Sequence, residues 1–199
     1  MEPALAVALL WLVFGGPRER GDTVPTVFQQ REVPEAIRSV SAFASHDYVD
    51  LFTVTTDAAA GASPEHWARA AVEAAGLAGQ FVWRVLCGLR LEWRPSPDYV
   101  GGWNIADRGD NWVRLEAASW FMTAHLVLEV DDGQLSVATF IRYDRPMAAL
   151  VWPPLSAGHR LLMPGLLRST VRMMRIAATR RSEAPELRGR EASVGDQPN

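Results

Sequence analysis

The chain has 199 residues, 48% of them hydrophobic, so it is long enough for one well-buried core and too short for two ordinary domains with a tail. Its formal net charge is -3, and all 20 basic residues are arginines spread along the chain. Such a chain offers phosphates no concentrated positive surface, so we expect no nucleic-acid partner. The single cysteine, Cys87, cannot form an internal disulfide, which fits a reducing cytoplasm.

An unbroken apolar run from Ala4 to Phe14 opens the chain. A secretory signal carries positive charge before its apolar stretch, whereas Glu2 precedes this one. A membrane-spanning helix needs about 20 apolar residues, roughly twice the length of this run. Three interpretations stay open: a start codon placed too far upstream, an anchor at a membrane surface, and a flap over the domain. We expect a cytoplasmic protein with residues 1–20 dispensable, and membrane association through this run as the alternative.

The run is followed by a polar segment that the sequence pattern marks as a connector. Residues 21–40 are interrupted by Pro25 and Pro34, although a short helical turn could begin at Pro34. We therefore assign residues 1–46 to the apolar run and connector, and residues 47–178 to the folded domain. Beyond Thr179 there is almost no apolar content to offset the cost of ordering, so residues 179–199 are expected to be disordered.

The predicted domain begins with a strand and two helices. Tyr48 to Val54 is rich in β-branched and aromatic residues, which predicts the strand. Ser63 and Pro64 are typical of a helix start, and Gly76 is typical of its end. A second helix is predicted from Gln80 to Leu89. Its apolar face would be formed by Phe81, Val85 and Leu89, with Trp83 and Cys87 beside it.

Four strands are predicted next, over residues 99–106, 112–120, 123–130 and 134–143. Asp132-Gly133 indicates a type I′ hairpin, because both central residues of that turn need positive φ. Pairing about this turn sets Leu128 opposite Val137 on an apolar, inward face. The other pairs on this face would be Val130 with Leu135, Leu126 with Thr139 and Ala124 with Ile141.

The remaining strands are placed by the same reasoning. Folding the preceding strand back over Phe121-Met122 brings Arg114 beside Glu129 on the outer face. In the strand over 99–106, Gly101 and Trp103 would point inward, and a glycine beside a tryptophan leaves either a bulge or room.

The last element is a long segment from Met147 to about Ala178 with apolar residues at helical spacing. Pro153, Pro154 and Pro164 are expected to kink or divide it. The whole pattern predicts an α+β fold of the helix-grip type, with a curved antiparallel sheet closed over a long C-terminal helix.

This order of elements resembles the START, Bet v 1 and polyketide-cyclase-like superfamily. Within it, the chain is similar to an uncharacterised domain family often fused behind NmrA-like NAD-binding domains. The likeness is carried by residues 112–117, 124–126 and 135–141, and above all by Pro154-Leu155, His159 and Pro164 to Arg168. The resemblance implies an apolar cavity enclosed between the sheet and the last helix. The chain lacks a Gly-rich dinucleotide fingerprint, so NAD chemistry does not carry over and no cofactor is expected.

These elements favour a module that binds a small apolar ligand, lipid-like or aromatic, between the sheet and the last helix. The candidate ligand-binding residues are Gly101, Trp103, Thr139, Tyr143, Trp152, Leu155 and His159. Thr139, Tyr143 or His159 would hold a polar end of the ligand. The alternatives for these residues are structural, with His159 capping a helix or sheet end and the tryptophans filling the core.

Two other functions stay open. A cyclase- or dehydratase-type enzyme would use His159 and Tyr143 to move protons on a polyketide-like substrate. An interaction protein would have a filled core instead, so an empty volume of a few hundred Å³ separates it from the other two. A metal site is not expected, because His125 and Glu129 share a strand face without a third ligand. Cys87 is expected to be an unreactive core residue.

Overall fold

A computed structural model describes residues 25–57 and 61–194 of the chain. The apolar run of residues 4–14 lies outside them. In chain order the elements are β1 (Val27–Gln30), α2 (Glu35–Val40), β2 (Tyr48–Thr55), α3 (Pro64–Phe81), the π-helical turn η2 (Val82–Leu86), β3 (Tyr99–Val100), β4 (Trp103–Arg108), β5 (Trp112–Ala118), β6 (Met122–Asp131), β7 (Gln134–Tyr143) and α4 (Met147–Val194).

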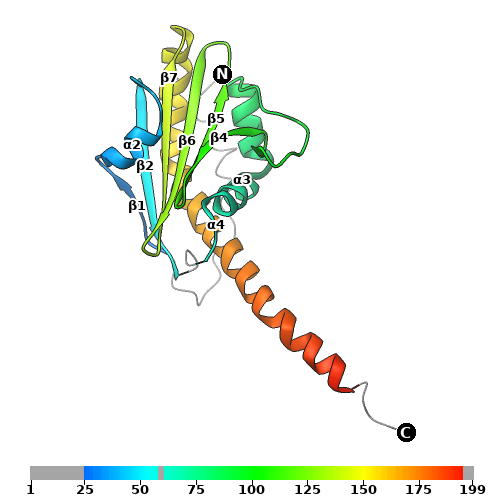
Figure 1. Ribbon diagram of the computed structural model, residues 1–199. Helices are drawn as coiled ribbons and strands as arrows, with labels where there is room; N and C mark the ends of the chain where they lie inside the picture. The colour runs from blue at the N-terminus through cyan, green and yellow to red at the C-terminus, as the bar shows by residue number, and fades with distance from the viewer. Residues whose placement is uncertain (1–24, 58–60, 195–199) are drawn as a thin grey trace.

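The strands form one antiparallel sheet in the order β1-β2-β7-β6-β5-β4-β3. Figure 1 shows the sheet curving around the first part of α4, with α3 beside that helix on the same face and α2 on the opposite face. We call the face toward α3 and α4 the inner face. The predicted α+β, helix-grip fold is confirmed.

The hairpin between β6 and β7 has the predicted register. Asp132 and Gly133 both have positive φ, 42° and 73°, as a type I′ turn requires. Leu128 lies opposite Val137, and the other three predicted pairs are present as well. Leu128 and Val137 are buried on the inner face, so alternation of apolar residues located this face correctly.

The turn between β5 and β6 differs from the prediction by two residues in register. Ala118 pairs with Thr123, so Arg114 lies opposite Val127 and the predicted pair of Arg114 with Glu129 is wrong. A shift of two residues keeps every side chain on its predicted face, which is why the inner face is unaffected. Ser119 fixes the observed turn, because its hydroxyl accepts hydrogen bonds from the backbone N–H groups of two following residues, Phe121 and Met122.

The strand predicted over 99–106 is a small hairpin instead. Gly101 and Gly102 have φ of 57° and 92° and turn the chain between β3 and β4. Val100 pairs with Trp103, and both residues are buried. Gly101 and Trp103 were expected to point inward, so the prediction is right for Trp103 and wrong for Gly101. Two adjacent glycines favour a turn because only glycine adopts positive φ without steric cost.

Helix α3 kinks at Gly76, where the first predicted helix ends, and the second helix predicted over 80–89 corresponds to the end of α3 together with η2. Ser63 accepts a hydrogen bond from the backbone N–H of His66, and Gly76 leaves the helical region with φ 55° and ψ -153°. The predicted apolar face of the second helix is wrong, since Phe81 and Val85 are 55% and 61% exposed. The helix ends in a π-helical turn, which rotates the following residues relative to a regular α-helix and places Cys87 in the core.

Residues 27–40 belong to the fold, which corrects the domain start predicted at residue 47. β1 pairs with β2, and α2 packs on the outer face of the sheet. Ile37 and Val33 join an apolar cluster there with Leu51, Val127 and Phe140. The sheet has apolar residues on both faces, and α2 with its flanking loops covers the outer set.

Helix α4 is neither divided by its prolines nor ended at Thr179. It runs from Met147 to Val194, beyond the start of the predicted disordered tail, and Figure 1 shows its last turns extending past the sheet. The prolines lack the backbone N–H that would donate within the helix. The first part of α4 stays helical because Trp152, Met163 and Leu167 pack in the core. Among the described residues, no helix is long and apolar enough to cross a membrane.

A candidate ligand cavity between the sheet and the last helix

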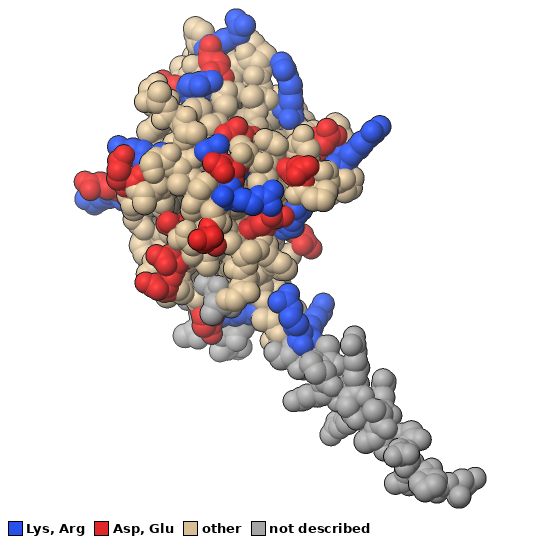
Figure 2. All heavy atoms as spheres, viewed as in Figure 1, with Lys and Arg blue, Asp and Glu red and all other residues tan. Residues whose placement is uncertain are grey.

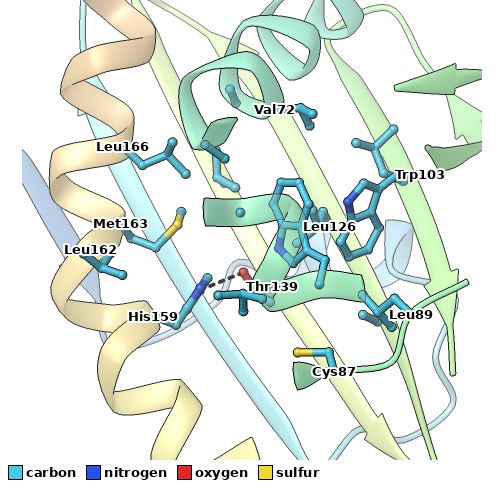
Figure 3. A pocket seen from close by; sticks show the side chains of 18 of the residues that line it. Val72, Cys87, Leu89, Trp103, Leu126, Thr139, His159, Leu162, Met163 and Leu166 are labelled. Atoms are coloured by element: carbon cyan, nitrogen blue, oxygen red, sulfur yellow. Dashed lines mark hydrogen bonds between the residues drawn. The ribbon is translucent and has the colours of Figure 1, made fainter. Parts of the chain in front are cut away.

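An apolar cavity of about 150 Å³ lies between the inner face of the sheet, α3 with η2, and α4. Figure 3 shows Leu126 and Thr139 from the sheet, Val72 from α3, and Met163 and Leu166 from α4 around it. Almost the whole wall is aliphatic or aromatic, with Thr139 and His159 as its polar side chains. The resemblance implied a cavity in this place. Its volume is smaller than the few hundred Å³ that would separate a binding module or an enzyme from an interaction protein.

Leu126 shows that the space above the sheet is not filled. It lies in the middle of β6, with Leu115 of β5 and Thr139 of β7 as its cross-strand neighbours. Both neighbours are buried, whereas Leu126 is only partly buried. A central side chain on an inner face is normally covered by packing, so the exposure of Leu126 reflects the cavity above it.

A polar cluster forms one end of the cavity. Nε2 of His159, on α4, lies 3.2 Å from Oγ1 of Thr139 and 3.2 Å from Oδ2 of Asp50. Tyr48 donates its hydroxyl proton to the same Asp50 oxygen at 2.6 Å. Asp50 and Thr139 are cross-strand partners on β2 and β7, so the sheet register holds them together beneath α4.

Asp50 is a buried acid, with a side chain only 1% exposed. Burial alone would raise its pKa, but hydrogen bonds from His159 and Tyr48 and the interaction with the imidazole outweigh burial and hold the pKa below 3.8. Burial and the neighbouring Asp50 charge raise the pKa of Tyr48, so the phenol stays a donor. An ionised carboxylate only accepts, so Nε2 of His159 carries a proton toward Asp50.

Some buried polar atoms near the cavity have no hydrogen-bond partner among the described residues. They are Oδ1 of Asp50 and the indole N–H groups of Trp103 and Trp152. Trp103 and Trp152 both line the cavity, and the Trp152 ring lies 5.9 Å from the His159 ring between centroids. Buried polar groups are normally paired, so these atoms could accept partners from a bound molecule or from water.

The structure brings five of the seven predicted site residues together at this cavity: Trp103, Thr139, Trp152, Leu155 and His159. Gly101 is not among them. It turns the chain between β3 and β4, and a Cβ there would overlap the Val72 side chain.

Tyr143 is also absent from the cavity wall, because it is the last residue of β7 and lies beyond Ile141. Its backbone N–H donates to Asp47 at 2.6 Å. The predicted pairing of His159 with Tyr143 at one site is therefore wrong.

Asp50 and Tyr48 were not among the predicted site residues. A signal for them was present, because alternate residues of β2, which was the first predicted strand, share one face: Tyr48, Asp50, Phe52 and Val54. An acid in an otherwise apolar inner face is costly unless it is paired, and it therefore points to a partner elsewhere in the chain. Which residue supplies that partner depends on how α4 crosses the sheet.

Cys87 and the acidic residues within the described part of the chain do not add a second site. Burial raises the pKa of Cys87 to about 12, so it remains a thiol at neutral pH, as expected of a core residue. No group of three or more His, Cys, Asp or Glu residues in the described chain could hold a metal ion.

His125 is on the outer face, as predicted, but it is buried. Its ring stacks on Phe43 with centroids 3.7 Å apart, and its Nδ1 lies in hydrogen-bond contact with the Ser41 carbonyl.

No family model matches the chain, and neither a curated protein nor a solved structure is significantly similar to it. The resemblance to the START and Bet v 1 superfamily therefore stays a prediction. Acidic and basic side chains alternate over the face seen in Figure 2, without a stripe of a single sign. The cavity is thus the feature of the described chain from which a function can be argued.

Proposed function

We propose that this protein binds a small, mainly apolar molecule in the cavity between the sheet and α4. The observation that carries the proposal is the cavity itself, an apolar space of about 150 Å³ with Thr139 and His159 together at one end. Binding sites for small molecules combine an apolar wall with a few placed polar groups, and this site has both.

The volume limits the ligand to a small one. Pockets for drug-sized molecules measure about 300 to 1,000 Å³, whereas an engineered apolar cavity of about 150 Å³ accepts benzene. A single aromatic ring or a short acyl chain therefore fits this cavity of about 150 Å³. A long-chain lipid would need α3 and α4 to move apart.

A proton-transferring enzyme is a second candidate, and the contact of His159 with Asp50 supports it. A carboxylate that orients an imidazole is a common arrangement of general bases. In that case His159→Ala should lower the rate about 10²- to 10⁴-fold with affinity largely kept, whereas a pure binding module should lose only modest affinity.

We place either activity in the reducing cytoplasm, where the lone thiol of Cys87 needs no partner.

The direct test is the binding of toluene to the purified protein, followed by tryptophan fluorescence and by the shift in melting temperature. Trp103 and Trp152 line the cavity, so an occupant should change tryptophan emission. Binding to the folded state should also raise the melting temperature in proportion to the logarithm of toluene concentration.

A pair of variants controls for surface binding. Ala124→Leu adds bulk to the cavity wall on β6 and should abolish toluene binding. Ala118→Leu makes the same change at an exposed position of the neighbouring strand and should leave it intact. Overpacking at Ala124 could cost about 1 to 3 kcal/mol, so folding is checked by circular dichroism. The proposal fails if the wild type does not bind toluene or if both variants bind it equally. The alternative function, that of an interaction protein, would then be favoured.

A further inference from the structure

The polar end of the cavity has a buried acid and a small set of hydrogen-bond donors and acceptors. Thr139 and His159 line the wall, and the carboxylate of Asp50 lies directly behind them, 3.2 Å from the imidazole nitrogen. The ligand would therefore meet a neutral hydroxyl and an imidazole with a buried acid behind them. These contacts restrict what the polar end of a ligand can be.

A ligand carboxylate would be placed against this acid. The side chain of Asp50 is 1% exposed, so water cannot screen its charge at the cavity end. Arg160 lies beside the cluster, with its guanidinium carbon 5.8 Å from the Tyr48 ring centroid and a hydrogen-bond interaction with the Tyr48 hydroxyl. Arg160 is on the exposed side of α4, where solvent weakens its effect inside the cavity. Two carboxylates at one buried site disfavour each other's ionised form.

A hydroxyl group suits the same end. It can donate to the hydroxyl oxygen of Thr139 and accept from a nearby indole N–H. Thr139 belongs to the cavity wall, and the indole N–H of Trp152 is a buried donor without a partner among the described residues. Trp152 is part of the cavity wall and lies beside His159.

We propose, building on the proposed function, that the natural ligand is a neutral small molecule with a hydroxyl group at the Thr139–His159 end, and that Asp50 excludes carboxylates. The ligand class is thus that of phenols and small alcohols rather than aromatic or fatty acids. Asp50 acts through charge, and Thr139 acts as the direct polar contact.

Two matched pairs of single-ring probes separate these effects by titration calorimetry. Phenol and toluene have the same size and differ by the hydroxyl, whereas benzamide and benzoate have nearly the same shape and differ by the charge. We expect phenol to bind at least about fivefold more tightly than toluene, and benzamide at least about tenfold more tightly than benzoate. The inference is overturned if benzoate binds as tightly as benzamide, or phenol no more tightly than toluene.

Variants show which side chains are responsible. Asp50→Asn keeps the shape and removes the charge, so the preference for benzamide over benzoate should fall to near one. Thr139→Val keeps the volume and removes the hydroxyl, so the preference for phenol over toluene should fall. Asp131→Asn, at an exposed position, should change neither ratio. Unchanged ratios in Asp50→Asn or Thr139→Val would contradict the assigned roles.

The wild-type ratios decide the ligand class even if Asp50→Asn does not fold. If toluene binds and the ratios are close to one, the ligand class is wrong and the proposed function stands. If none of the four probes binds, the proposed function is wrong and this inference is wrong with it.

Discussion

Leu128→Ala tests the inner face of the sheet and the cavity in one experiment. Leu128 is buried on β6 between its cross-strand partners Val113 and Val137, and it is part of the cavity wall. Leu135 is a matched control. It is fully buried in the same hairpin but does not line the cavity.

The magnitude follows from what the substitution removes. Loss of three carbon atoms from a buried site costs about 2.4 kcal/mol, at roughly 0.8 kcal/mol for each methylene. A residual void of about 50 Å³ would add roughly 1.2 kcal/mol, at about 24 cal/mol for each Å³. Leu128→Ala should therefore lower the free energy of unfolding by about 3 to 4 kcal/mol, and Leu135→Ala by a similar amount.

The assay is urea denaturation followed by far-UV circular dichroism, with and without saturating toluene. Toluene should restore part of the lost stability in Leu128→Ala, because the enlarged space adjoins the cavity, and should restore less in Leu135→Ala. A cost below about 1 kcal/mol for Leu128→Ala would show that the side chain is not buried as described. Equal recovery by toluene in the two variants would refute the position of the cavity.

Three further predictions concern the outer face and the N-terminus. Arg114→Ala should cost about 1 to 3 kcal/mol in urea denaturation, because its side chain is 13% exposed and donates to the Val40 carbonyl at 2.7 Å; a cost near zero would contradict that contact. Burial lowers the pKa of His125 below 6.5, so the unfolded state binds the proton first and the free energy of unfolding should fall as pH decreases from about 6.5. Replacing His125 with Gln should flatten that slope between about pH 6.5 and 5, and an unchanged slope would assign it to other groups. A chain beginning at Val24 should melt like the full chain, and a loss of several degrees would show that the apolar run packs on the domain.

The fold could be predicted because its main signals are local. Alternation of apolar residues in β6 and β7, with Asp132-Gly133 between them, determines both the faces and the register of the hairpin. Ser63 and Gly76 mark the first helix by capping and by positive φ, which are properties of single residues. Such signals do not depend on the rest of the chain.

The predictions that failed concern a contact between distant segments and a local change in helix geometry. The elements within residues 27–40 are only 4 and 6 residues long, and β1 becomes a strand because β2 presents a free edge to it. The exposed face of η2 could not be read from helical spacing, since a π-helical turn changes the residues per turn. In the first case a contact with a distant strand overrides the local pattern, and in the second a change in helix geometry does.

The register error and the missed acid have different consequences for the site. A two-residue error between β5 and β6 left every side chain on the predicted face, so the inner face of these strands was predicted correctly while the Arg114 pairing was wrong. Asp50 was missed although it breaks the apolar pattern of its own strand. Local sequence rules are most often broken where a residue serves function. Asp50, which interrupts the apolar face of β2, was therefore a better guide to the candidate site than the apolar pattern itself.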